Sequence, residues 1–263
     1  MKVLTIYDGT IQSKTALQYG IGKVKDNGGE LIVLHVFPSA LFIDYDAGPK
    51  AEEIARAEAK QHLLDAENII RETGKSVPIH LVTEEGDPEQ ELLRVAEAEK
   101  PELILATPRY KAVSKKAPYP VYVMPGTILV PVDNSETLIT DAGKIAKEAK
   151  ASGSKVLLLG VVPVHLYGTE EKHELDQVQK ATVATMKKIK KVLHNENIDA
   201  EEIIRSGYPD EEILKAADEY GVSLIMLPAG GKTPSELAKA AAILLDEPER
   251  LKRPVYVMPP VEA

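Results

Sequence analysis

The sequence contains no cysteine among its 263 residues. Disulfide bonds, thiolate metal ligands and a cysteine nucleophile are therefore excluded, and a reducing compartment fits this composition. No apolar run approaches the roughly 20 residues that a membrane-spanning helix needs. The first residues enter an apolar run directly, without the basic head and small-residue cleavage site of a signal peptide. We therefore expect a cytoplasmic protein.

The sequence also has no excess of basic residues. Its formal net charge is -9, with 32 Lys and Arg against 41 Asp and Glu. Residues 1–125 contain 15 basic and 19 acidic side chains, and the remainder contains 17 and 22, which gives about -4 and -5. Nucleic acids and anionic membranes bind to basic patches. We therefore expect neither of them as a partner.

Sequence signatures of several enzyme classes are missing. The segments DGTIQS (Asp8–Ser13) and DNSETL (Asp133–Leu138) do not match the Ser-Gly-Gly-x-Asp-Ser loop of the pyrophosphatase-loop enzymes. There is no Walker loop and no Gly-x-Ser-x-Gly elbow. We predict a protein without catalytic residues. Slow ATP hydrolysis, or a Ser/His/Asp set assembled in space, remains the alternative.

The chain contains a long internal repeat. The hexapeptide PVYVMP occurs at Pro120–Pro125 and again at Pro254–Pro259. Three further segments of the first half recur in the same order in the second half. The pairs, first half before second, are VLTIYDGT with ILVPVDNS, GGELIVLHVFP with GSKVLLLGVVP, and EGDPEQELLRVAEAEKPELILATP with SGYPDEEILKAADEYGVSLIMLPA. A period this long indicates tandem domains. We predict one domain over residues 1–125 and a second over residues 126–263.

Strand-like and helix-like segments alternate within each half. Val3–Tyr7 and Leu31–Val36 are continuous apolar runs, which is typical of buried parallel strands. Between them, Ser13–Asp26 has apolar residues at helical spacing and ends before Asn-Gly-Gly. Asp87 and Pro88 open a later helix, with Gln90 at the capping-box position. This alternation predicts βαβ units and a parallel sheet in each half.

Two aspartates mark the expected binding edge of these sheets. Asp8 and Asp133 each follow the first strand of their half and precede a small residue. Ligands of open α/β sheets bind beyond the carboxyl ends of the strands. A carboxylate there can accept hydrogen bonds from a ribose hydroxyl or a base. The alternative interpretation is that each aspartate caps the helix that follows it.

The order and spacing of these motifs resemble the universal stress protein family. The resemblance rests on the apolar-Asp-small end of the first strand, the LHV of Leu34–Val36, the GDP of Gly86–Pro88 and the final PVYV strand. It covers nearly the whole chain, as two copies. It implies an α/β fold of two tandem Rossmann-like domains, each a five-stranded, mainly parallel sheet flanked by helices.

The resemblance also implies partners. The two PVYVMP strands would lie at sheet edges and pair with each other as a pseudo-dimer within one chain, which would cover an aggregation-prone edge. A homodimer and a regulatory protein partner of unknown identity are further expectations.

Nucleotide-binding members of this family carry a glycine-rich stretch after the fourth strand, namely Gly-x-x-Gly, nine residues, and Gly-Ser or Gly-Thr. In the second half, Pro228 replaces the first glycine, Gly231 matches the second, and Ala241-Ala242 replace the last pair. The first half has no glycine between Thr107 and Pro125. Glycines let backbone N–H groups approach phosphates. We therefore expect the first half to be unable to hold a triphosphate.

The resemblance assigns candidate ligand-binding residues in both halves. Asp133 and Val161 would contact the adenosine, and Gly231, Lys232 and Thr233 would lie on the phosphate side. Asp8 and Val36 match the adenosine positions in the first half. The implied ligand is ATP or AMP with Mg, in the C-terminal domain.

The implied function is a stress-response or regulatory module with degenerate nucleotide sites. The alternative is an ATP- or AMP-binding switch with weak or no hydrolysis that uses only the C-terminal domain.

Three other groups of side chains could bind or react, and each also has a simpler interpretation. His165 and His173, with nearby glutamates, could hold a metal, but a solvated loop is the interpretation that we favour, so we predict no metal site. His35 could be a base or a packed histidine. A basic cluster could bind an anion or could belong to a solvated loop, and it comprises Arg109, Lys111, Lys115 and Lys116.

Overall fold

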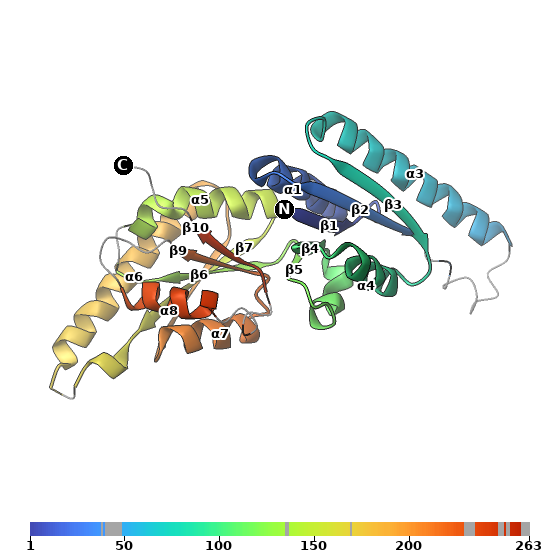
Figure 1. Cartoon of the computed structure of the whole chain (residues 1–263). Helices are drawn as coiled ribbons and strands as arrows, with labels where there is room; N and C mark the ends of the chain where they lie inside the picture. Colours follow the sequence, from blue (N-terminus) through green and yellow to red (C-terminus); the bar gives the residue numbers. More distant parts are fainter. Residues whose placement is uncertain are drawn as a thin grey trace. The chain divides into compact units, whose positions relative to one another are not determined.

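The computed structural model describes residues 1–37, 39, 49–134, 137–168, 170–228, 235–246, 250 and 253–258. The chain separates into two compact units, Met1–Pro125 and Gly126–Ala263, which we call unit 1 and unit 2. Figure 1 shows the helices and strands of both units.

Unit 1 is built on a five-stranded sheet in which all strands are parallel. The strand order is β3-β2-β1-β4-β5, so β1 lies at the centre and β5 at one edge. Its elements in chain order are β1 (Lys2–Ile6), α1 (Ile11–Asn27), β2 (Glu30–Phe37), α3 (Pro49–Thr73), β3 (Ile79–Glu85), α4 (Pro88–Glu99), β4 (Leu103–Ala106), the 3-10 helix η1 (Pro108–Lys115) and β5 (Val121–Val123).

Unit 2 repeats this topology with the strand order β10-β9-β6-β7-β8, again all parallel. Its elements are β6 (Thr127–Val132), α5 (Thr137–Ser152), β7 (Lys155–Val162), the 3-10 helix η2 (Val164–Leu166), α6 (Lys172–Asn195), β8 (Ala200–Ser206), α7 (Pro209–Glu219), β9 (Leu224–Pro228), α8 (Glu236–Asp246) and β10 (Val255–Met258). The prediction of two tandem Rossmann-like α/β domains with five-stranded parallel sheets is confirmed.

The central strands are buried because helices cover both faces of a parallel sheet. In unit 1, Leu4 and Ile6 of β1 belong to an apolar cluster with Leu34 of β2 and Leu92 of α4, and all four are at most 1% exposed. Burial of a leucine or isoleucine side chain contributes about 1.5–3 kcal/mol to folding. The intervening β1 residues, Thr5 among them, point to the opposite face, because successive side chains of a strand alternate.

In the segment between β4 and β5, the basic side chains are exposed to solvent as expected, but the segment is not a loop. It forms η1, which begins at Pro108, and proline is suited to the first turn of a helix. The two strands of the repeated hexapeptide, β5 and β10, each lie at a sheet edge. Their pairing with each other stays a prediction.

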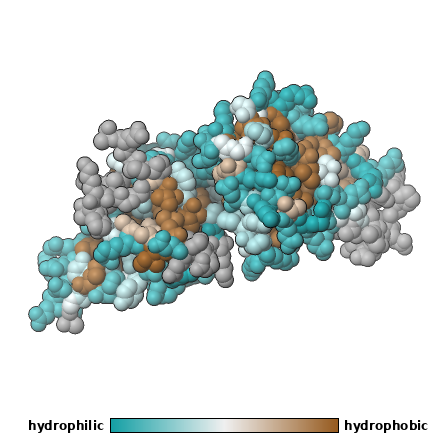
Figure 2. Space-filling model, in the orientation of Figure 1, coloured by the Kyte–Doolittle hydropathy of each residue, from teal (hydrophilic) through white to brown (hydrophobic). Residues whose placement is uncertain are grey.

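The visible face of each unit is mainly hydrophilic, with hydrophobic areas between the hydrophilic residues (Figure 2). Among the described helices, none is long and apolar enough to cross a membrane.

Candidate functional site

The carboxyl end of β1 in unit 1 holds Asp8 in a tight turn. Asp8 Oδ1 accepts hydrogen bonds from the Thr10 backbone N–H at 3.2 Å and from Thr10 Oγ1 at 2.6 Å. Thr10 Oγ1 in turn accepts from the N–H of Ser13 at 3.2 Å. Thr10 is therefore the N-cap of α1. The alternative that Asp8 itself caps this helix is wrong, because Asp8 positions the cap instead.

The second oxygen of Asp8 is contacted from η1. The hydroxyl of Tyr110 donates a hydrogen bond to Asp8 Oδ2 at 3.1 Å, and Arg109 Nη1 lies 3.7 Å from the same oxygen. Tyr110 is 3% exposed and belongs to the apolar cluster of the sheet, so its ring is fixed by packing. Both carboxylate oxygens of Asp8 thus have partners within unit 1.

These contacts determine the charge state at the strand end. Burial alone would raise the pKa of Asp8, but hydrogen bonds from Thr10 and Tyr110 outweigh burial and hold this pKa below its ordinary value. Burial, followed by the nearby Asp8 charge, raises the pKa of the Tyr110 hydroxyl. Asp8 is therefore a carboxylate and Tyr110 a neutral donor at neutral pH.

A second polar group lies behind Asp8, between the sheet and α3. His35 is 3% exposed, and its Nδ1 lies 2.9 Å from the carbonyl oxygen of Tyr7. A carbonyl can only accept, so Nδ1 carries the proton. His35 Nε2 and the Tyr7 hydroxyl are buried without a hydrogen-bond partner among the described residues. Burial lowers the pKa of His35, and burial raises that of Tyr7 to about 12.

His62 of α3 connects this buried group to the turn that holds Asp8. Its ring lies 6.0 Å from the His35 ring, at 79°. A Cβ added to Gly9 would lie 2.2 Å from His62 Cδ2, so the ring packs directly on the backbone of Gly9. The φ of Gly9 is +78°, which few other residues adopt. His35 is a packed histidine here rather than an exposed base.

Unit 2 presents the corresponding strand end with different neighbours. Val132 of β6 pairs with Gly160 of β7, so Asp133 and Val161 lie one residue beyond this pair on adjacent strands. Val161 is 7% exposed, as is Val36 in unit 1. Three predicted phosphate-side residues lie outside the described residues, namely Gly231, Lys232 and Thr233. Of the residues predicted to bind a nucleotide in unit 2, the described part of the chain therefore includes Asp133 and Val161.

The described residues resume at Ser235, directly before α8. Ser235 Oγ accepts a hydrogen bond from the N–H of Ala238 at 3.1 Å, so Ser235 caps the helix. Pro228 ends β9, and Ala241 is buried at 6% exposure. The assignment of ligand-binding roles to these residues stays a prediction.

The other candidate residues have contacts of their own. His165 stacks on Tyr208, with ring centroids 4.1 Å apart, and His173 forms a 2.8 Å hydrogen bond with Gln177. No group of three metal-binding side chains occurs within the described ranges. From the basic cluster, Lys116 pairs with Glu89 at 3.3 Å.

Two contacts that define the strand end were missed by sequence reasoning. Tyr110 lies 102 residues from Asp8, and His62 lies on the long charged helix α3. The available signal for Tyr110 was an aromatic residue in a segment where the second half has glycines. No sequence signal identified His62.

Comparison with known proteins agrees with this architecture. The model of the Universal stress protein family matches residues 1–123 and again residues 124–240. Universal stress protein MJ0577 of Methanocaldococcus jannaschii is 29% identical over 113 residues, which is 43% of this chain and 70% of that protein.

Solved structures of universal stress proteins are also similar. One from Archaeoglobus fulgidus is 20% identical, covers 98% of this chain and 96% of its own, and has a TM-score of 0.42. Another from Archaeoglobus fulgidus, solved in complex with dAMP, is 22% identical over 46% of this chain and 94% of its own, with a TM-score of 0.35. The family assignment rests on the two tandem matches of the family model, and this chain therefore belongs to the universal stress protein family.

Proposed function

We propose that this chain is a non-catalytic stress-response or regulatory module in which unit 2 alone takes an adenine nucleotide. The observation that carries the proposal is the engagement of both Asp8 oxygens by Thr10, Tyr110 and Arg109. A ribose hydroxyl that bound to Asp8 Oδ2 would have to displace the Tyr110 hydroxyl. Unit 1 thus already supplies, from its own side chains, the donors that a nucleoside would offer.

Displacement of Tyr110 would be costly because the residue is buried. A buried hydroxyl that loses its partner costs about 1–3 kcal/mol, which corresponds to about a 5- to 150-fold loss of affinity. Unit 1 also lacks glycines in η1, so its backbone offers no close approach to phosphates. Both ends of a nucleotide would therefore bind poorly in unit 1.

Unit 2 keeps the residue types that an adenine nucleotide needs. Asp133 and Val161 occupy the ends of adjacent strands, and the segment between β9 and α8 contains Gly231, Lys232 and Thr233. A helix N-terminus such as that of α8 favours anions. Because Pro228 and Ala241-Ala242 replace family glycines and a hydroxyl, we propose weak binding of AMP or of ATP with Mg.

We assign no catalytic turnover to unit 1, because its buried titratable groups are poorly suited to act as a general base. A general base works best with a pKa near the working pH. The pKa of Asp8 is below its ordinary value, and the pKa of Tyr7 is raised to about 12. His35 has an unprotonated Nε2, but the ring is 3% exposed and packed between the sheet and α3, away from the solvent. A regulatory role would therefore follow from occupancy of unit 2 rather than from hydrolysis.

The experiment is native mass spectrometry of the full chain, with AMP or Mg-ATP added up to millimolar concentration, followed by calorimetry of two matched variants. We expect at most one nucleotide per chain. Asp133→Ala should lower the affinity by about tenfold or more, since a hydrogen bond to a charged group contributes about 1.5–3 kcal/mol. Asp8→Ala should leave the affinity unchanged.

Three outcomes would contradict the proposal. Two nucleotides per chain would show that unit 1 also binds a nucleotide. Equal losses from the two variants would show that the strand ends are equivalent. Steady release of ADP that Asp133→Ala abolishes would make the protein an enzyme.

A further inference from the structure

Helix α6 of unit 2 carries a concentrated positive charge within an acidic chain. From Gln177 to Asn195 it contains five lysines and no acidic residue, although the whole chain has a formal net charge of -9. The corresponding helix of unit 1 is different. From Ala55 to Thr73, α3 has three basic and four acidic side chains, so its charges are mixed.

Most of these lysines have no counter-ion among the residues that the structure describes. Lys190 lies 3.8 Å from Glu202 of β8. Within the described part of the chain, the other four have no ion pair, and they are Lys180, Lys187, Lys188 and Lys191. Several of them are three or four residues apart, where like charges repel each other and destabilise a helix. A negatively charged partner would remove this repulsion.

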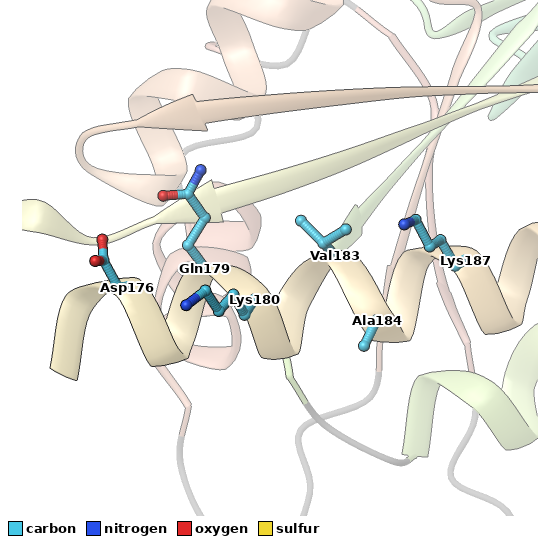
Figure 3. A pocket seen from close by; sticks show the side chains of 6 residues that line it. All are labelled: Asp176, Gln179, Lys180, Val183, Ala184 and Lys187. Carbon is cyan, nitrogen blue, oxygen red and sulfur yellow. The ribbon is translucent and has the colours of Figure 1, made fainter. Parts of the chain in front are cut away.

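Four of the five lysines, all except Lys188, line two neighbouring open hollows along one side of the helix. The first has a volume of about 510 Å³, and Figure 3 shows its six lining residues on α6. In this view Gln179, Val183 and Lys187 point to the same side of the helix. The second has a volume of about 580 Å³ and extends to the start of β8. Lys187 lines both, so we call them together the α6 groove.

The α6 groove combines charge with an apolar surface. Val183 and Ala184 line the first hollow, and Ile198 and Ala200 line the second, between the lysine stems. Each hollow is also lined by one acidic residue, Asp176 in the first and Asp199 in the second. The positive charge of the α6 groove comes from the lysines that lie between these two aspartates. With a rise of about 1.5 Å per residue, the lining from Asp176 to His194 extends about 27 Å.

We propose that the α6 groove binds an acidic amphipathic segment of another protein. An extended, mixed apolar and basic surface matches a helix that has carboxylates beside small apolar side chains. Among the described residues, neither hollow is lined by arginine, phenylalanine, tyrosine or tryptophan, which bind phosphates bidentately or stack on bases, and His194 is the one ring in the lining. The groove is therefore better suited to a polypeptide than to a nucleic acid. This role is independent of nucleotide binding in unit 2.

The test uses the full chain and a synthetic helical peptide that repeats glutamate and leucine at helical spacing. Fluorescence anisotropy at 50 mM salt should show saturable binding that weakens in 500 mM salt, because salt screens exposed charges. Lys187→Glu should lower the affinity at least tenfold, since this lysine lines both hollows. Lys172→Glu is the matched control, because it makes the same charge change on α6 outside both hollows, and it should change the affinity less than threefold.

Four results would overturn the proposal. They are no binding of the peptide, equal losses from the two variants, a preference for inorganic polyphosphate or a single-stranded oligonucleotide that Lys187→Glu abolishes, and self-association that disappears in Lys187→Glu when followed by sedimentation. The third would assign the groove to a polyanion, and the fourth to a second copy of the chain. Circular dichroism of both variants checks that α6 remains folded.

Discussion

Each unit places an aspartate at the end of the first strand of its own sheet, but the segments after the fourth strands differ in sequence. Asp8 is enclosed by Thr10, Tyr110 and Arg109. Asp133 follows β6, and the sequence between β9 and α8 contains glycines where the corresponding segment of unit 1 contains Tyr110. In unit 1, the side chains of η1 that reach Asp8 therefore decide what surrounds the end of the first strand.

A second difference lies between the sheet and the long helix of each unit. In unit 1, Tyr7 and His35 occupy positions that are Val132 and Gly160 in unit 2, each 125 residues later. A Cβ added to Gly160 would lie 2.9 Å from Met186 Sδ of α6, so the helix packs directly on the strand. In unit 1 the His35 and His62 rings lie between sheet and helix instead. Unit 1 thus buries titratable groups where unit 2 buries apolar ones.

The largest expected effect comes from Gly9→Ala. This change adds a Cβ 2.2 Å from His62 Cδ2 at a φ of +78°, so it combines a steric clash with backbone strain. We expect unit 1 to lose about 2–4 kcal/mol of unfolding free energy in urea denaturation followed by hydrogen exchange of β1 and β2. Gly28→Ala has a similar φ of +72° and open space, so it should cost only about 1–2 kcal/mol.

The double variant Gly9→Ala with His62→Ala separates the two causes. Removal of the ring should recover the steric part of the loss and leave the strain. If the double variant is no more stable than Gly9→Ala alone, the contact between the glycine and the ring is not the cause.

Tyr110→Phe should have the next largest effect. It removes the hydrogen bond to Asp8 Oδ2 and leaves a partly buried carboxylate with one fewer donor. We expect a loss of about 1–2 kcal/mol in unfolding free energy and an upward shift of the pKa of Asp8, measured by NMR titration of its carboxyl carbon. The control is Tyr167→Phe in unit 2, which should change neither quantity. An unchanged pKa of Asp8 would show that the hydroxyl does not stabilise the carboxylate.

The pH dependence of stability should also distinguish the units. Burial lowers the pKa of His35 in the folded state, so the unfolded chain binds this proton more readily. Unit 1 should therefore be stable above the ordinary histidine pKa of about 6.5 and lose stability as the pH falls below it, by at most about 1.4 kcal/mol per pH unit for one proton. Hydrogen exchange of each unit between pH 7.5 and 5 measures this slope.

His35→Asn should flatten the acid slope of unit 1, because asparagine keeps a donor for the Tyr7 carbonyl and does not titrate. The exposed His194→Asn in unit 2 is the control and should leave that slope unchanged. A slope that persists in His35→Asn would assign the effect to another group.

The smallest expected effect concerns the N-caps of two equivalent helices, α4 in unit 1 and α7 in unit 2. Asp87 caps α4 by accepting from the N–H of Gln90 at 2.9 Å, whereas Tyr208 occupies the same position before α7 and forms no side-chain cap. Asp87→Ala should destabilise unit 1 by about 1 kcal/mol. Tyr208→Asp should stabilise unit 2 by less than that, because it also loses the stacking on His165. Tyr208→Ala measures the stacking loss alone, and a Tyr208→Asp variant no more stable than it would refute the capping argument.

Much of the fold could be predicted from the sequence because its signals are local. Apolar runs such as Val3–Tyr7 and the helical spacing of Ser13–Asp26 mark strands and helices within a few residues of β1 and α1. The repeat of these signals indicated two domains. The position of Asp8 at a strand end followed from the same reasoning, as did the capping of α4 by Asp87.

The environment of that site could not be predicted in the same way. Thr10 as the cap, Tyr110 as the partner of Asp8 and the packing of His62 on Gly9 each depend on which side chains the folded chain brings together. The lysines of α6 can be read from the sequence, but the net charge of -9 for the whole chain gave no indication of this local positive charge. Only the folded helix shows that Lys187 lies in a groove shared with apolar side chains.

The sequence by itself determined the family, the tandem organisation and the two aspartates, because periodicity and motif order are properties of neighbouring residues. The tertiary structure decided that Asp8 is closed by Tyr110, a residue 102 positions away. Contacts over such separations depend on the register of the sheet and on the path of η1, which no local pattern encodes.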